Sequence, residues 1–284
     1  MGIARHESGA AGAARALASQ VHPVFMLPPL AASAFGAVLA RELSPTLAAV
    51  HLGAVFCALY TAHVKDGYVD FYARGEDDDH PLTEWGCRRA LLASSVGFFA
   101  LLAVVALLAG PVAALLTLPG WLIGYFHAPQ LDVNPVSATA GYPAGIGFAL
   151  LGGHYVQSGG LSGTVLAFAV VFVVVLSGIK TIDDAKDYEY DRSISKRTVA
   201  VVLGPRRARL TAYGLMGAGM LVVALLALLT PVFPPSSVAA ALAFAAIAAL
   251  TRPMPPELAT KVLVRGSYVF LAFLVAAVWF RPLA

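Results

Sequence analysis

Nine apolar runs, separated by polar connections, occupy most of this 284-residue chain. Each run is long enough to span, or nearly span, the hydrocarbon core of a bilayer as a helix. A bilayer offers no water to the backbone, which favours helices because they satisfy their own hydrogen bonds. A content of 59% apolar and 12% charged residues agrees, since soluble domains carry about 25% charged residues. The sequence predicts an all-α integral membrane protein with nine transmembrane helices, over residues 22–40, 46–64, 88–109, 111–127, 138–157, 162–181, 208–230, 235–250 and 262–280.

Charged residues fall almost entirely on one side of the predicted membrane. Of the 19 Lys and Arg residues only Arg41 and Arg281 lie opposite the N-terminus, which leaves 17 on its side. Since cytoplasmic loops carry the excess of Lys and Arg, we expect a cytoplasmic N-terminal tail, residues 1–20, in a multi-pass protein of the cell membrane. Of the 16 Asp and Glu residues only Glu42 lies on the far side. Acids contribute little to orientation, so their placement indicates a function on the cytoplasmic face.

Two acidic clusters lie where apolar runs end. Asp66 and Asp70 follow the second run, and Asp183, Asp187 and Asp191 follow the sixth. Carboxylates four residues apart lie along one face of a helix, where a row of like charges is costly unless a cation neutralises it. Mg²⁺ prefers oxygen ligands and is commonly shared with substrate phosphates. These five residues are the predicted metal ligands, and two such rows would hold a diphosphate through Mg²⁺.

The second cluster has a specific sequence context. It reads Asp-Asp-Ala-Lys-Asp-Tyr-Glu-Tyr-Asp over residues 183–191, and Lys-Arg-Thr at 196–198 and Leu-Gly at 203–204 follow. This order resembles the second aspartate motif of the UbiA superfamily of intramembrane prenyltransferases. Residues 65–74 more loosely resemble the family's first motif, Asn-Asp-x-x-Asp-x-x-x-Asp. Asp66 stands at the Asn position, Asp70 keeps the second acid, and Arg74 occupies the position of the third.

The resemblance implies one membrane domain over residues 1–284, with its helices bundled around a central, lipid-accessible cavity. It implies a prenyltransferase that uses Mg²⁺ to move a polyprenyl group from an isoprenoid diphosphate to an aromatic acceptor, a quinone precursor. General chemistry agrees, because cations neutralise the leaving diphosphate and a dry cavity protects the carbocation from water. The expected partners are these two substrates and the bilayer, and nothing resembles a nucleic-acid-binding module. The implied catalytic residues are Asp66, Asp70, Asp183 and Asp187.

Two basic residues that the family commonly has are missing. The Arg-Pro near the first span appears here as His22-Pro23, and residues 126–137, between the fourth and fifth spans, contain no Lys or Arg. We therefore expect basic residues beside the two motifs to bind the diphosphate: Lys65, Arg74, Lys180, Lys196 and Arg197.

The connection between the fourth and fifth spans offers polar groups that suit a hydrogen-bonded acceptor. His154 lies in the run 153–159, Gly-His-Tyr-Val-Gln-Ser-Gly, which resembles a stretch of the branch that prenylates 1,4-dihydroxy-2-naphthoate. A structural role is an equally good interpretation of His127 and His154, and the acidic run 76–79 is typical of a solvated loop. The predicted acceptor-binding residues are His22, Tyr125, His127, Asn134 and His154.

Other functions stay open. Within the enzyme class they are prenyl transfer to a non-aromatic lipid acceptor and terpenoid cyclisation. An ion-binding transporter would usually hold its acids near the bilayer midplane, whereas these acids lie at span ends. An inactive membrane scaffold would explain the incomplete first motif. The acids of the second motif could also simply pair with neighbouring bases, namely Lys180, Lys186, Arg192 and Lys196.

Overall fold

The computed structural model describes residues 2–281, which form helices joined by short connections. Within this range the one β-bridge is an isolated antiparallel pairing of Ala4 with Leu82. The all-α prediction is therefore confirmed. Contacts divide the chain into two compact units: unit 1 holds the residues up to Asp132 together with Ala144–Leu161, and unit 2 holds Val133–Pro143 and the residues from Ser162 onward. The single-domain prediction stays a prediction.

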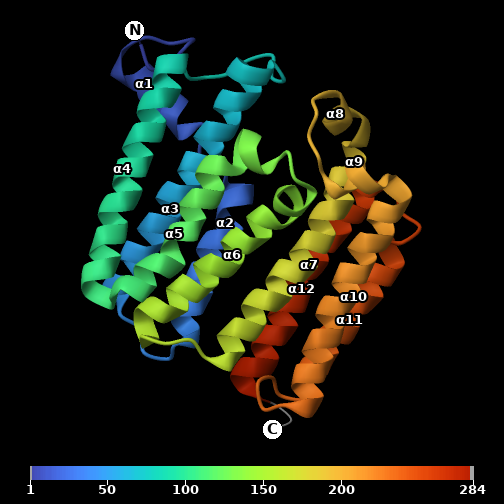
Figure 1. The fold of residues 1–284 in the computed structure, drawn as a ribbon. Coiled ribbons are helices and arrows are strands. Elements are labelled where there is room, and N and C mark those ends of the chain that lie inside the picture. Colours follow the sequence, from blue (N-terminus) through green and yellow to red (C-terminus); the bar gives the residue numbers. More distant parts are fainter. Residues whose placement is uncertain (1, 282–284) are drawn as a thin grey trace. The chain divides into compact units, whose positions relative to one another are not determined.

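Unit 1 is built around a long helix that ends in a π-helical segment. This helix, α3, packs against α2, α4 and α5 (Figure 1). Side chains of Ser44 and Thr83 accept hydrogen bonds at the starts of α3 and α4, as Ser and Thr N-caps do. The elements are α1 (Gly9–Ala18), α2 (Pro23–Leu39), α3 (Pro45–Tyr68), η1 (Val69–Arg74), α4 (Glu84–Ala109), α5 (Pro111–Phe126), η2 (His127–Leu131) and α6 (Pro135–Ser158), whose first residues belong to unit 2.

Unit 2 is built around α7, which packs against α10 and α12, while α11 packs against α10 and α12. Close approach depends on a glycine: a Cβ added at Gly178 of α7 would lie 2.7 Å from the carbonyl oxygen of Ala212 in α10. Small residues let helices in membranes pack this tightly. The elements are α7 (Gly163–Lys186), α8 (Tyr188–Ser193), α9 (Val199–Leu203), α10 (Pro205–Leu229), α11 (Ser237–Thr251) and α12 (Pro256–Phe280).

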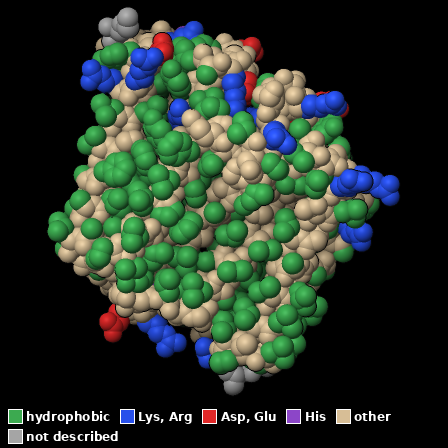
Figure 2. Space-filling model, viewed as in Figure 1, with side chains coloured by type: hydrophobic (Ala, Val, Ile, Leu, Met, Phe, Trp, Pro, Cys, Tyr) green, Lys and Arg blue, Asp and Glu red, His purple; other side chains and the backbone are tan. Residues whose placement is uncertain are grey.

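The helix surfaces suit a lipid environment. Leu107 is 84% exposed, Phe280 76% and Leu229 74%, and Figure 2 shows hydrophobic side chains over much of the viewed face. Contiguous apolar surface of this kind is rare on soluble proteins. Among the described residues six helices are long and apolar enough to cross a bilayer, or seven if the bent pair α1 and α2 counts as one span. The chain is therefore a multi-pass membrane protein, while the count of nine spans and the central cavity stay predictions.

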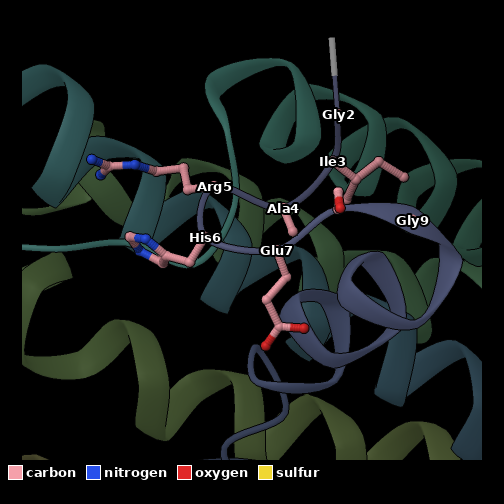
Figure 3. Close-up of a pocket in the computed structure, with 8 residues that line it drawn as sticks. Gly2, Ile3, Ala4, Arg5, His6, Glu7 and Gly9 are labelled. Carbon is pink, nitrogen blue, oxygen red and sulfur yellow. The ribbon is translucent and has the colours of Figure 1, made fainter.

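An N-terminal hook covers the connection between η1 and α4. The backbone of Ile3 accepts a hydrogen bond from Thr83 N–H, and Arg5 N–H donates to Pro81. Figure 3 shows the side chains of Arg5 and His6 extending together, and both lie within 4 Å of the Asp79 carboxylate. The hook encloses a pocket lined by residues 2–9, none of which is a predicted site residue. Its effect is to fix the segment that follows the first acidic cluster.

Candidate active site

The first acidic cluster lies where α3 changes its winding. The helix runs as α3 to Tyr68 and continues as the π-helix η1 from Val69 to Arg74. Such turns are rare and frequently occur at functional sites. Asp66 lies in the last turn of α3 and Asp70 in η1. The side chain of Asp66 is 45% exposed and that of Asp70 is 20% exposed, so both carboxylates border on accessible space.

Imidazole rings gather beside Asp66. The Nε2 atom of His127 is 4.0 Å from an Asp66 carboxylate oxygen. His22 precedes the first residue of α2 and stacks on His63, one turn before Asp66, with ring centroids 4.8 Å apart. The structure thus brings His22, which precedes α2, and His127, the first residue of η2, to the first acidic cluster.

Lys65 lies among aromatic rings. Its Nζ atom is 5.4 Å from the ring centre of Tyr125 and 5.9 Å from that of Tyr68. An ammonium over an aromatic face is attracted by the ring quadrupole. Tyr125, a predicted acceptor residue, therefore adjoins a predicted diphosphate residue.

The other two predicted acceptor residues have structural roles. His154 Nδ1 is 3.3 Å from the carbonyl oxygen of Gly36, and this contact joins α6 to α2. Gly36 lies about 20 Å along α2 from His22, at 1.5 Å per residue. The Asn134 carboxamide oxygen accepts from backbone N–H groups that open α6. Both side chains serve packing and capping, so we remove them from the proposed acceptor site.

Arg74 is surrounded by acids rather than open to a diphosphate. Its guanidinium lies 3.0 Å from Asp132, 3.4 Å from Glu76 and 3.7 Å from Asp70. The prediction that Arg74 binds diphosphate is therefore revised. Glu76 also departs from the expected solvated loop, since its side chain is only 6% exposed, whereas residues 77–79 are exposed. The predicted acidic ligands did not include Glu76 or Asp132. The glycine at position 75, which adopts a left-handed conformation after η1, is the sequence signal that could have indicated a reversal of the chain before Glu76.

The second acidic cluster spans a helix break. In unit 2, α7 ends at Lys186, α8 begins at Tyr188, and Asp187 between them has φ −97° and ψ 15°. The prediction that Asp183, Asp187 and Asp191 share one face of a continuous helix is wrong. The chain turns at Asp187, whose carbonyl oxygen accepts a 2.8 Å hydrogen bond from Asp191 N–H.

Basic side chains neighbour these acids. Lys186 Nζ is 2.6 Å from an Asp183 oxygen and 3.9 Å from one of Asp187. Lys180 pairs with Asp184, which is 3% exposed. Asp184 is not among the predicted site residues, although the spacing of four residues from Lys180 is that of a helical ion pair. Because Lys180 is engaged by a buried carboxylate, we remove it from the proposed diphosphate ligands.

Asp191 has the most perturbed carboxyl outside the spans. Burial raises the pKa of this carboxyl to about 6, against the opposing effect of the Lys196 ammonium. The Lys196 N–H also donates to the Asp191 carbonyl oxygen over 2.9 Å. A bound cation would favour the ionised carboxylate, which is the form that coordinates metal.

The Lys-Arg-Thr and Leu-Gly residues shape the connection that carries the basic groups. The Thr198 side chain accepts from Val201 N–H and caps α9, while Gly204 has φ 77° and separates α9 from α10. Glycine adopts such a backbone at no steric cost. On this connection Arg197 is exposed and Lys196 is half-buried.

The donor set fits Mg²⁺ shared with a substrate. Among residues 2–281 no group of three or more His, Cys, Asp or Glu side chains is placed to hold a metal by itself. Mg²⁺ is usually bound by one or two carboxylates and completes its shell with water and phosphate oxygens. The carboxylates that could serve are the partly or fully exposed Asp66 and Asp70 in unit 1 and Asp183 and Asp187 in unit 2, together with the buried Asp191.

The chain is similar in fold to solved membrane proteins. A structure described as digeranylgeranylglyceryl phosphate synthase in membranes gives a TM-score of 0.73 at 16% identity, covering 94% of this chain and 99% of that one. A UbiA homologue from Archaeoglobus fulgidus bound to GPP and Mg²⁺ gives 0.65 at 18% identity, covering 94% and 99%. A UbiA homologue from Aeropyrum pernix K1 gives 0.65 at 17% identity, covering 90% and 98%. At these identities the comparisons establish the fold.

Family membership follows from the sequence match. No curated protein matches the chain. The UbiA prenyltransferase family matches residues 26–274, which include both acidic clusters and most of the helices. The chain therefore belongs to the UbiA prenyltransferase family and is a prenyltransferase of the membrane.

Proposed function

We propose that this enzyme transfers a polyprenyl group from an isoprenoid diphosphate to an aromatic quinone precursor in the membrane, with Mg²⁺ as its cofactor. The observation that carries the proposal is the placing of partly exposed carboxylates beside basic side chains: Asp66 near His127 at the end of α3, and Asp183 beside Lys186 at the end of α7. The UbiA homologue from Archaeoglobus fulgidus, which is similar in fold, has been solved with GPP and Mg²⁺ and with DMAPP and Mg²⁺.

Carboxylates of both motifs would hold Mg²⁺: Asp66 and Asp70 in the first, and Asp183, Asp187 and Asp191 in the second. Bound Mg²⁺ supplies positive charge that stabilises the diphosphate as it leaves. In the second motif Lys186 is the present counter-ion of Asp183. It would move from Asp183 toward the incoming anion as the metal binds.

Direct contacts to the diphosphate fall to Lys65, Lys196 and Arg197. Arg binds phosphate through a planar fork and Lys as a point charge. Arg197 is exposed, and none of the ion pairs among the described residues includes it, so its guanidinium can bind the diphosphate.

The acceptor is proposed to bind near His22, Tyr125 and His127. Ring nitrogens of the two histidines can hydrogen-bond a phenolic hydroxyl, and Tyr125 stacks on Trp121 with centroids 4.9 Å apart, giving a flat apolar wall. Such a wall also excludes water from a reactive prenyl group.

A second candidate is transfer to a glycerol-phosphate lipid. It is favoured by the similarity in fold to digeranylgeranylglyceryl phosphate synthase. Exposed basic residues such as Arg197 would serve such an anionic acceptor as well as a diphosphate.

We also propose that the N-terminal tail and both motif connections face the cytoplasm, within one nine-span domain. The asymmetry of Lys and Arg supports this orientation. Helices occur in all nine predicted ranges, although α6 and α11 are not among the helices that meet the length and hydropathy for spanning.

One assay tests the reaction and the acceptor together. Purified protein in lipid nanodiscs receives labelled geranylgeranyl diphosphate with 1,4-dihydroxy-2-naphthoate, 4-hydroxybenzoate or a glycerol-phosphate lipid, with Mg²⁺ or with EDTA. Mg²⁺-dependent labelling of an aromatic acceptor is expected. Labelling of the glycerol lipid alone would establish the second candidate, and no Mg²⁺-dependent diphosphate release with any acceptor would contradict the proposal.

A further inference from the structure

A chain of side-chain contacts runs from the N-terminal hook, residues 2–9, to the end of α3. The guanidinium carbon of Arg5 lies 4.4 Å from the ring centre of Phe71 in η1. The Phe71 ring lies against the ring of His80, with centroids 5.9 Å apart. His80 in turn packs on Gly67 of α3, where an added Cβ would lie 2.6 Å from His80 Nε2. Arg5, Phe71 and His80, which we call the hook cluster, therefore connect three segments of unit 1.

The hook cluster contacts the chain beside both aspartates of the first motif. Gly67 directly follows Asp66, and Phe71 directly follows Asp70. His80 contacts both of these neighbours, on either side of the change from α3 to η1. Since position 67 has no side chain, the imidazole can approach the helix backbone closely. The cluster thus fixes how the backbone at one aspartate lies relative to the backbone at the other.

His80 is itself held in place. The residue is buried, and Leu82 N–H donates a 3.2 Å hydrogen bond to its Nδ1. Tyr72 of η1 packs its ring against His80 at a centroid distance of 6.1 Å and donates from its hydroxyl to the Leu82 carbonyl oxygen over 2.8 Å. A ring whose rotamer is locked by packing and hydrogen bonds can hold its neighbours precisely.

The backbone of the hook keeps Arg5 over Phe71. Arg5 N–H donates to the Pro81 carbonyl oxygen over 2.9 Å. The Ile3 carbonyl oxygen lies so close to α4 that a Cβ added at Gly86 would be 2.3 Å from it. Figure 3 shows the Arg5 side chain extending from the hook. A cation over an aromatic face is attracted by the ring quadrupole, so Arg5 secures the outer end of the hook cluster.

We propose that Arg5 is a positioning residue of the active site, which acts through Phe71 and His80 to fix the spacing of Asp66 and Asp70 for Mg²⁺. This role rests on the proposed function, in which these two aspartates hold the cation. Ligands that are ordered before the cation arrives bind it with less loss of conformational freedom. The hook is then part of the catalytic apparatus, although it lies at the opposite end of unit 1's sequence from η2.

The test is the Mg²⁺ dependence of diphosphate release from geranylgeranyl diphosphate, measured with the full chain in nanodiscs and the acceptor that it prenylates. Arg5→Gln is expected to raise the Mg²⁺ concentration for half-maximal release about twofold to fivefold, proportionally more than it lowers the rate at saturating Mg²⁺. Loss of a positive charge alone would favour cation binding. The direction of the shift therefore separates positioning from a general charge effect.

Other variants locate the effect. Arg5→Lys keeps a cation over the ring and is expected to restore most of the Mg²⁺ affinity. Arg89→Gln is the matched control, because Arg89 lies 4.9 Å from the ring centre of Trp85, a contact of the same kind within α4. Asp79→Asn removes the exposed partner that lies 3.6 Å from the Arg5 guanidinium, and such pairs contribute little. Neither Arg89→Gln nor Asp79→Asn should shift the Mg²⁺ dependence.

A double variant tests the route through the ring. If Arg5 acts through Phe71, Arg5→Gln combined with Phe71→Leu should shift the Mg²⁺ dependence no further than Phe71→Leu alone. Fully additive shifts would overturn the inference. An unshifted Mg²⁺ dependence in folded Arg5→Gln, or an equal shift in Arg89→Gln, would overturn it as well. In each of these cases the unchanged protein is active, whereas an unchanged protein that releases no diphosphate with Mg²⁺ would overturn the proposed function and this inference together.

Discussion

At the scale of single residues, Arg197 is the side chain whose loss most directly tests where the anion binds. Arg197→Gln removes one charge-assisted contact, expected to contribute about 1.5–3 kcal/mol, or about tenfold to a hundredfold in apparent affinity for prenyl diphosphate. Arg207→Gln is the matched control, because Arg207 is exposed on the first turn of α10. Equal losses in the two variants, measured by titration with prenyl diphosphate, would mean that the anion site lies elsewhere.

The acids and bases of the second motif could be predicted because their identities and order stand in the sequence. The partners of Arg74 could not, since they depend on the reversal at Gly75 and on where η2 delivers Asp132. His154 and Asn134 looked like ligands for a related reason. A polar side chain in an apolar context has the same sequence signature whether it binds substrate or a neighbouring backbone.

At the scale of helices, the contact of α2 with α6 is set by glycines. A Cβ on Gly153 would lie 2.1 Å from the Ser33 carbonyl oxygen, whereas one on Gly145, also in α6, meets nothing within 4 Å. Gly153→Ala is expected to cost about 1–3 kcal/mol by overpacking and to lower the midpoint of thermal unfolding in detergent. Gly145→Ala should leave the midpoint unchanged or raise it, because Ala favours helix. A larger fall of the unfolding midpoint in Gly145→Ala than in Gly153→Ala would show that the contact at Gly153 is not the tight one.

Helix positions followed from the apolar runs, and Ser, Thr and Pro marked several of their starts. The departures from regular α-helix could not be predicted from these patterns. The turn to a π-helix after Tyr68 and the break at Asp187 lie in mixed-charge segments, where four-residue spacing indicates a regular helix. Hydrogen bonds and ion pairs formed in the folded chain decide the backbone there.

At the scale of the whole molecule, the distribution of charge predicts orientation. In a background lacking Cys57 and Cys87, the Ser193→Cys variant is expected to react with a membrane-impermeant thiol reagent only after the cell membrane is permeabilised. Glu42→Cys, predicted on the other face, should react from outside in intact cells. Labelling of Ser193→Cys from outside would contradict the proposed orientation.

An all-helical membrane protein could be predicted from hydropathy alone, and the family from the second motif. The number of spans could not be settled in the same way. Hydropathy does not register the bend of 65° between α1 and α2 or the shortness of α11 at Ser237–Thr251. Length and composition describe a segment, whereas its path through a bilayer also depends on the helices that pack against it.

The aspartates at the end of α7 are proposed to hold the metal that drives prenyl transfer, and the Asp187→Asn variant tests this role. The measurement is Mg²⁺-dependent diphosphate release in nanodiscs, with Asp77→Asn as the control because Asp77 is an exposed acid outside both motifs. Diphosphate release is expected to fall by more than about 100-fold in Asp187→Asn, the size typical of removing one charge-stabilising group, with an unchanged unfolding midpoint. Turnover in Asp187→Asn equal to that in Asp77→Asn would contradict it.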